Sequence, residues 1–363
     1  MKKRILAIIL AALFLVSCKK QGQEYSGLNE FEVLDINIDG LSNSDAMDIA
    51  GNMIREKYPI TTIKYVEEDN IIDEIDLTKA GIKLLAEFRA KEDNIIVLDQ
   101  EDNNIKVIDW EGNLLKSIGK LGSGDMEFKI PTAFFFDQAN KLYYVLDNGN
   151  RRIVVIDEDF NFVKNIEVKT FKDKQNADIF NSIVLYKDKI YLSEAYGSEK
   201  TMAIISIDMD GNEKLYDQKF GGFLKVVDDK LYAIENHRGF KYGEEVNTSF
   251  GTHEMVIWTP NGDTMYLVEE DGMKKLYDLP ILSNCTDLLK IGDFYYFAGS
   301  TFGFVNIFKD EKGELKYIKS MNKRIKTEYG KDDSKRLRMQ EYKNTIILSD
   351  TWSKKIFIID LSR

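Results

Sequence analysis

The sequence contains few of the residue types that mark disulfide-rich domains, interdomain linkers and histidine-based metal enzymes. Its 363 residues include two cysteines, two histidines and four prolines. A catalytic zinc site usually has three protein ligands, often histidines, so this chain would need a carboxylate to complete one. No Pro-, Gly- or Ser-rich stretch interrupts residues 60–363. The sequence therefore favours one large domain over the two that its length suggests.

The sequence also has fewer basic than acidic residues. It contains 50 Lys and Arg and 61 Asp and Glu, which gives a net charge of −11. An acidic surface repels phosphate backbones and anionic lipid surfaces, so we expect no nucleic-acid partner. One locally basic stretch, Lys323–Arg338, is diluted by Glu328, Asp332 and Asp333. We predict that this stretch is a solvated loop.

What the sequence does contain is a short strand that recurs at nearly constant spacing. Its copies end at Asp109, Asp157, Asp208, Thr259, Asp310 and Asp360, with gaps of 48, 51, 51, 51 and 50 residues. Four of these ends are followed three residues later by a glycine, namely Gly112, Gly211, Gly262 and Gly313. A period near 50 with a strand and a turn in each unit indicates a repeat architecture.

Each unit also has an earlier strand, rich in β-branched and aromatic residues. These strands end at Asp99, Asp147, Glu194, Glu235, Gly299 and Asp350. With an inner and an outer strand added, each unit becomes a four-stranded blade that needs neighbours on both faces. We predict an all-β fold, a six-bladed β-propeller spanning residues 31–363. A pair of β-sandwich domains is the alternative, and the constant period argues against it.

The last repeat has no strand after Asp360, so an N-terminal segment is expected to supply its outer strand. We predict that Ile60–Val66 closes the ring in this way, which removes an exposed sheet edge. Before it, Asp45–Lys57 is predicted to form a short N-terminal helix, with Ser44 as its N-cap and Pro59 after its end.

Residues 1–17 are typical of a bacterial lipoprotein signal peptide. Three basic residues precede an apolar stretch, Ile5–Val16, that is too short to span a bilayer. The following Leu15–Cys18 segment looks like a lipobox, which implies cleavage before Cys18 and lipid on its sulfur. We expect residues 18–30 to form a lipid-anchored tether, and the protein to sit in the bacterial cell envelope. Cys285 is then the only thiol, and we expect it to be buried.

One stretch resembles a known repeat family in detail. Residues Gly119–Asp157 are similar to an NHL repeat through Gly122, Gly124, Glu127, Phe128, Pro131, Asp137, Tyr143, Asp147, Asn150, Arg151 or Arg152, Ile153 and Asp157. The layout also resembles the six-bladed propeller lipoproteins of Bacteroidota-type bacteria, although Asp125 replaces the proline of their G-x-G-P-x-E turn. The resemblance implies a fold and little about activity. Asp147 is expected to join adjacent blades through Arg151 or Arg152.

We expect a ligand on the end of the ring that carries the connections between second and third strands. Its largest insertion, Asn236–His253, mixes charges with aromatic residues, and long loops on rigid scaffolds tend to carry function. The predicted binding face comprises Asp147, Asn150, Tyr196, Glu235, His237, Arg238, Tyr242, Phe302, Asp350 and Trp352. The expected ligand is a protein, peptide or glycan, the protein is expected to be a monomer, and the membrane is contacted only through the N-terminal lipid.

Two other functions remain open. A metal-dependent hydrolase or lyase of the lactonase-like propeller type would use Ca²⁺ or Zn²⁺, held by carboxylates at the channel or by His237, His253 and one of Glu235, Glu244 and Glu254. The leading hypothesis assigns no cofactor and no catalytic residue, because G-x-S-x-G, Walker and dinucleotide-binding patterns do not occur in a strand–turn–helix context. Asp208–Asn212 lacks the ligand order of a calcium loop and is predicted to be a β-turn. A third hypothesis is a structural subunit of an envelope complex.

Overall fold

The computed structural model describes residues 65–66, 71–170, 180–194, 203–216, 220–235, 239–248, 251–259, 264–279, 285–299, 305–321, 337–351 and 353–361. Within residues 239–259 the description is of the backbone. The predicted N-terminal helix, the signal peptide and the tether lie outside these residues. In the described part of the chain, no helix has the length and hydropathy needed to cross a membrane.

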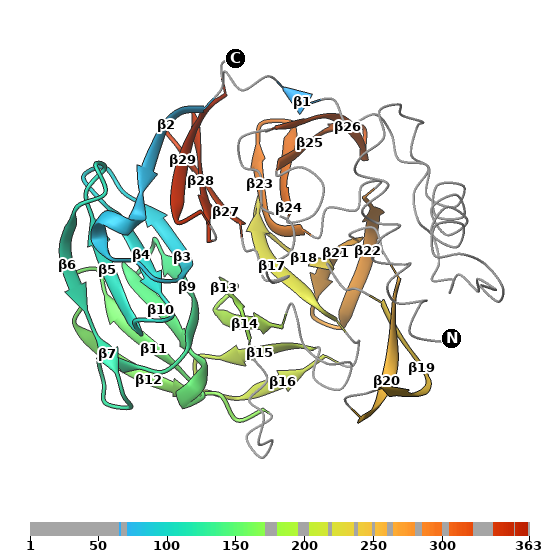
Figure 1. Cartoon of the computed structure of the whole chain (residues 1–363), viewed down its shortest axis with the longest axis horizontal. Helices are drawn as coiled ribbons and strands as arrows, with labels where there is room; N and C mark the ends of the chain where they lie inside the picture. The colour runs from blue at the N-terminus through green and yellow to red at the C-terminus, as the bar shows by residue number, and fades with distance from the viewer. Residues whose placement is uncertain are drawn as a thin grey trace.

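Six blades, each with four antiparallel strands, are arranged around a central axis, and the sheet of blade five has one further, parallel strand (Figure 1). The first three are consecutive in the sequence. Blade one is β3 (Leu85–Ala90), β4 (Ile95–Asp99), β5 (Asn104–Ile108) and β6 (Leu114–Ile118). Blade two is β9 (Pro131–Asp137), β10 (Leu142–Asp147), β11 (Arg152–Asp157) and β12 (Phe162–Glu167). Blade three is β13 (Ser182–Tyr186), β14 (Lys189–Ser193), β15 (Ile204–Asp208) and β16 (Glu213–Leu215).

The remaining three blades include the one that carries the long insertion and the one that closes the ring. Blade four is β17 (Gly222–Val227), β18 (Lys230–Glu235), β21 (Thr264–Glu269) and β22 (Gly272–Asp278). Blade five is β23 (Cys285–Ile291), β24 (Phe294–Gly299), β25 (Val305–Glu311) and β26 (Glu314–Met321). Blade six is β27 (Leu337–Tyr342), β28 (Thr345–Asp350), β29 (Lys355–Asp360) and β2 (Ile71–Asp76). The predicted all-β, six-bladed propeller closed by an N-terminal strand is confirmed.

The apolar core lies between the blades. Six clusters of buried apolar side chains lie between the six pairs of neighbouring blades. One of these clusters lies between blade six and blade one, where the ring closes. Ile347 and Ile356 of blade six pack with Leu85 and Ile95 of blade one in that cluster. The strands therefore bury both faces, as their continuous apolar runs predict.

The predicted closing strand is wrong in its position. β2 pairs antiparallel with β29 from Ile71↔Ile359 to Asp76↔Lys355 and completes blade six. The two described residues of the predicted segment form β1 (Tyr65–Val66), which pairs in parallel with β26 of blade five. β2 fits because Ile71 packs into the blade five–six cluster and Ile75 into the blade six–one cluster.

The fourth repeat also differs from the prediction. The strand ending at Thr259 is not the third strand of blade four, because β18 pairs directly with β21 through Glu235↔Thr264. Residues 251–259 instead form β20 (Gly251–Thr259), which pairs with β19 (Gly239–Thr248) in a separate hairpin. The insertion is thus a regular hairpin longer than Asn236–His253, and Figure 1 shows it at the rim beside β22.

Short elements connect blades one and two at the same end as the second–third connections. β7 (Lys120–Leu121) pairs in parallel with β8 (Glu127–Phe128) within the glycine-rich turn. Among the described residues, the 3-10 helix Leu77–Ala80 links β2 of blade six to blade one, and the 3-10 helix Asn148–Asn150 lies between β10 and β11 of blade two. After the glycine-rich turn and β8, Pro131 begins β9, the inner strand of blade two.

Candidate functional site

The predicted site residues Asp147 and Asn150 belong to a structural network. The fully buried Asp147 carboxylate accepts hydrogen bonds from the Lys129 backbone N–H at 2.6 Å, Asn150 Nδ2 at 2.8 Å and Arg152 Nε at 2.8 Å. Burial raises the pKa of Asp147, while these donors oppose the shift. Arg152 Nη2 also donates to the carbonyls of Gly124 and Glu127. The network therefore holds the glycine-rich turn against blade two.

Other predicted face residues also serve the scaffold or lie outside the described residues. Asp350 is buried, and Glu235 accepts a hydrogen bond from the Tyr266 hydroxyl at 2.8 Å. Tyr242 lies in β19, where only the backbone is described. Cys18, Tyr196, His237, Arg238, Phe302 and Trp352 fall outside the described residues. Cys285 is buried, as predicted.

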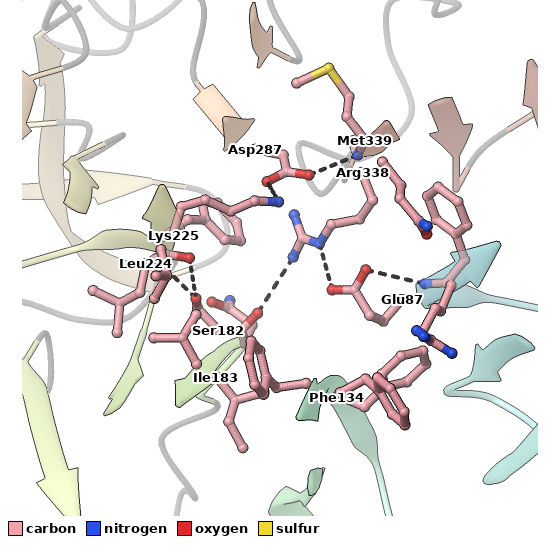
Figure 2. Close-up of a pocket in the computed structure, with 18 of the residues that line it drawn as sticks. Glu87, Phe134, Ser182, Ile183, Leu224, Lys225, Asp287, Arg338 and Met339 are labelled. Carbon is pink, nitrogen blue, oxygen red and sulfur yellow. Dashed lines mark hydrogen bonds and ion pairs between the residues drawn. The ribbon is translucent and has the colours of Figure 1, made fainter. Parts of the chain in front are cut away.

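A cavity of about 270 Å³ lies on the central axis and is lined by the inner strands of all six blades (Figure 2). None of the described residues of the predicted face lines it. Its polar and charged lining includes Glu87, Arg89, Asn181, Ser182, Lys225, Asp287, Arg338 and Gln340. Its apolar lining includes Phe134, Ile183, Phe223, Leu224 and Met339. Central cavities of this kind are the usual place to look for a binding site.

Arg338 of β27 crosses one end of this cavity. Its Nε donates to Glu87 Oε2 of blade one at 3.1 Å, and its Nη1 donates to the Thr286 carbonyl of blade five at 2.5 Å. Its Nη2 donates to the Asn181 carbonyl, and the guanidinium carbon lies 4.6 Å from the centre of the Phe223 ring. One side chain of blade six therefore contacts blades one and five and the segments that begin blades three and four.

A second ion pair joins blades four and five. Lys225 Nζ lies 2.7 Å from Asp287 Oδ1. The same carboxylate accepts hydrogen bonds from the Leu288 N–H at 2.8 Å and the Met339 N–H at 2.7 Å. Asp287 is thus satisfied by two backbone donors before Lys225 is counted.

Burial controls the electrostatics of Glu87. Loss of water around its carboxyl raises its pKa, and the nearby Asp287 charge acts in the same direction. Arg338 and Lys225 oppose this shift, as does the hydrogen bond from the Phe88 N–H to Glu87 Oε1. The shift shows that desolvation outweighs the ion pair with Arg338.

The lining becomes more exposed toward the carboxyl ends of the inner strands. Asn181, Asp287 and Arg338 near the strand beginnings are buried, whereas Arg89, Lys225 and Gln340 are partly exposed. Arg89 stacks on Phe136 at 3.7 Å. The cavity therefore opens toward the turns between first and second strands, which is the end opposite the predicted face.

The described residues do not provide the constellation that the metal-dependent alternative needs. No group of three or more His, Cys, Asp and Glu that could hold a metal ion occurs among them. Asp208 Oδ1 accepts from the Asn212 N–H at 2.8 Å and Oδ2 from Asn212 Nδ2 at 2.9 Å, which closes the predicted turn. The same pairing recurs at Asp109–Asn113 and Asp157–Asn161. The Asp208 segment is therefore a repeat turn.

Sequence reasoning missed the charged residues of the channel. It assigned Arg338 to a solvated basic loop, but Arg338 is the second residue of β27 and is buried. A usable signal existed, because Glu87, Asp287 and Arg338 are each the second or third residue of an inner strand, opposite Leu98, Ala298 and Ser349 of the second strand. Alignment of the inner strands of the repeats would have brought the three charges to one level.

Comparison with known proteins agrees with the architecture. The sequence profile of a family described as a 6-bladed beta-propeller matches residues 79–244. None of the curated proteins matches this chain. A Bacteroides thetaiotaomicron protein of unknown function is 12% identical, with 83% of this chain and 75% of that chain covered and a TM-score of 0.51.

Two further solved structures have slightly lower TM-scores. U3-55K is 10% identical, with 80% of this chain and 98% of that chain covered and a TM-score of 0.50. Virginiamycin B lyase from Staphylococcus aureus is 14% identical, with 80% and 98% covered and a TM-score of 0.48. At these identities a likeness shows the fold alone, and the similarity to the lyase carries no argument about activity.

Proposed function

Because this chain is a six-bladed β-propeller whose residues 79–244 match the family described by that fold, we propose that it is a lipid-anchored binding protein of the bacterial cell envelope. It acts without catalysis and binds a protein, peptide or glycan at the end of the ring that carries the blade-four insertion. It works as a monomer without a cofactor, contacts the membrane through its N-terminal lipid and does not bind nucleic acid.

The observation that supports this proposal best is the β19–β20 hairpin. Blade four is complete without it, because β18 and β21 pair directly from Tyr232↔Leu267 to Glu235↔Thr264. The hairpin is nevertheless regular, with pairs from Gly239↔Thr259 to Thr248↔Gly251 and one irregularity between Tyr242 and Glu245. An ordered element that the scaffold does not need is a good candidate for a contact with another molecule.

The test replaces residues 239–259 by a short Gly-containing turn. We expect the variant to keep the wild-type unfolding temperature and to lose its partner in cross-linking of envelope fractions and on glycan and peptide arrays. A control variant replaces the Gly292–Asp293 turn of blade five, at the opposite end of the ring, by Asn-Gly and should keep the partner. Equal binding by the hairpin deletion and the wild type would remove the hairpin from the proposed site.

Anchoring is tested separately. Cys18→Ala removes the sulfur that would carry the lipid, so the variant should leave the membrane fraction and lose incorporation of labelled fatty acid. A variant that stays in the membrane fraction would contradict the lipid anchor.

A further inference from the structure

The Lys225 ammonium has hydrogen-bonding capacity left in the channel. An ammonium group has three N–H donors, and Asp287 Oδ1 accepts one of them at 2.7 Å. The Lys225 side chain is 28% exposed, so the remaining donors face the cavity and its solvent. Asp287 itself is held by the backbone N–H groups of Leu288 and Met339. A second acceptor can therefore share Lys225 without leaving Asp287 unpaired.

With both carboxylates ionised, the described charges around the cavity sum to an excess of one cation. Arg89, Lys225 and Arg338 face the two carboxylates of Glu87 and Asp287. This local excess occurs in a chain whose net charge is −11. One incoming monoanion would balance the lining, and a charge with partners in a confined site is favoured over an unbalanced one.

The rest of the wall favours a carbon body on that anion. Phe134, Ile183, Leu224 and Met339 are apolar lining residues whose side chains also belong to the clusters between the blades, and Figure 2 shows the labelled residues arranged around a common space. The cavity volume of about 270 Å³ leaves room for several water molecules or one small organic group. That space suits a short aliphatic or aromatic group rather than a long chain or an oligosaccharide.

We propose that the central channel is a binding site for a carboxylate that bears a short apolar group. The carboxylate binds the Lys225 ammonium beside the Arg338 guanidinium, and the apolar group packs against the wall around Phe134. The ligand enters from the end with the turns between first and second strands, where the lining is more exposed. The carboxylate is that of a free small acid or of the C-terminal residue of a peptide. This site is separate from the hairpin, so the two proposals can fail independently.

The experiment titrates the mature protein without its lipidated Cys18, residues 19–363, with phenylacetate, with the tripeptide Ala-Ala-Leu and with its C-terminal amide. Calorimetry gives the affinity, and the ¹H–¹⁵N signals of Leu288 and Met339, which donate to Asp287, report the location. We expect at least one acid to bind saturably and to shift both signals, and the amide to bind about tenfold more weakly or worse. Binding of phenylacetate alone would identify a small acid, and binding of the tripeptide would identify a peptide C-terminus.

Lys225→Met should lower the affinity by about tenfold or more, because it removes the donor and the charge. Lys290→Met is the matched control, since Lys290 also lies on an inner strand in an ion pair, with Asp228, but does not line the cavity. The acid-versus-amide comparison uses the unmodified protein and so stands even if Lys225→Met does not fold. Absence of saturable binding up to about 10 mM of either acid, or equal affinity of Lys225→Met and wild type, would overturn the proposal.

Discussion

At the scale of single residues, the structure distinguishes between two adjacent arginines that the motif leaves equivalent. Arg152 binds the buried Asp147 and three carbonyls of the glycine-rich turn, those of Ser123, Gly124 and Glu127. Arg151 has a left-handed backbone with φ of 53° and ends the 3-10 helix Asn148–Asn150. The distinction depends on which of the two side chains reaches Asp147 and the glycine-rich turn, and the spacing of the motif residues in the sequence does not determine that.

This arrangement predicts different outcomes for two similar substitutions. Arg152→Lys should lower the free energy of unfolding by about 2 kcal/mol, because a lysine cannot reproduce the fork that binds Asp147 and the three carbonyls. Arg151→Lys should stay within about 0.5 kcal/mol of wild type. Urea unfolding of both variants checks this, and an equal loss would assign the tie to both arginines.

Glu87 provides a prediction about pH. Its folded-state pKa is raised above the ordinary value of 4.5, so the folded protein holds this proton more tightly than the unfolded chain does. The Glu87 contribution to stability therefore falls as pH rises from about 4.5 through the folded-state pKa. Glu87→Gln does not titrate, so its stability relative to wild type should improve over that range.

The control for this measurement is Glu311, whose pKa is lowered by its hydrogen bond with Lys316. The contribution of Glu311 is present above 4.5 and disappears as pH falls through its folded-state pKa, so Glu311→Gln should show the opposite trend. A Glu87→Gln difference that stays constant between about pH 4 and 8 would contradict the raised pKa.

At the scale of elements, ring closure depends on which N-terminal strand fits between two cores. Ile60–Val66 and β2 are both β-branched segments with polar residues between, and local composition does not separate them. β2 is selected because Ile71 and Ile75 are buried, 7% and 2% exposed, in clusters on opposite sides of blade six. Those clusters exist only when the ring is assembled.

Truncation tests this assignment. A chain that begins at residue 71 should keep a cooperative unfolding transition, whereas one that begins at residue 77 should lose about 4 kcal/mol or more, because two buried isoleucines and a strand partner of β29 are removed. Thermal and urea unfolding of both chains give the comparison. If both were destabilised equally, the segment before residue 71 would be the one that closes the ring.

The fourth repeat shows why a period can mislead. The strand ending at Thr259 keeps the spacing of 51 residues on both sides, yet it belongs to the hairpin. The true third strand is Thr264–Glu269, and its neighbour β22 follows after the Glu270–Asp271 turn. The insertion moves the third strand of blade four further along the sequence, and the hairpin strand β20 lies at the position that the repeat period predicts for that third strand. Only the pairing of β18 with β21 shows which of the two belongs to the blade.

At the scale of the whole molecule, three carboxylates that a metal ion could use, two at the channel and one in a repeat turn, already have protein partners. Glu87 binds Arg338, Asp287 binds Lys225 and two N–H groups, and Asp208 binds Asn212. We therefore expect the mature protein, purified without chelators, to contain no stoichiometric Ca²⁺ or Zn²⁺. Elemental mass spectrometry measures this, and the unfolding temperature should not move when either ion is added. One ion per chain would revive the metal-dependent alternative.

The sequence was enough to predict a six-bladed ring from its repeat period, its strands with apolar residues on both faces, and its turns. Each blade repeats the same local sequence pattern, and each blade needs a neighbouring blade to bury its apolar faces. The central site was not predictable in this way. Glu87, Lys225, Asp287 and Arg338 come from four different blades, and the residues between them in sequence give no sign that they meet. Only closure of the ring brings their inner strands to one axis, and only there does burial turn ordinary charged residues into paired groups around a cavity.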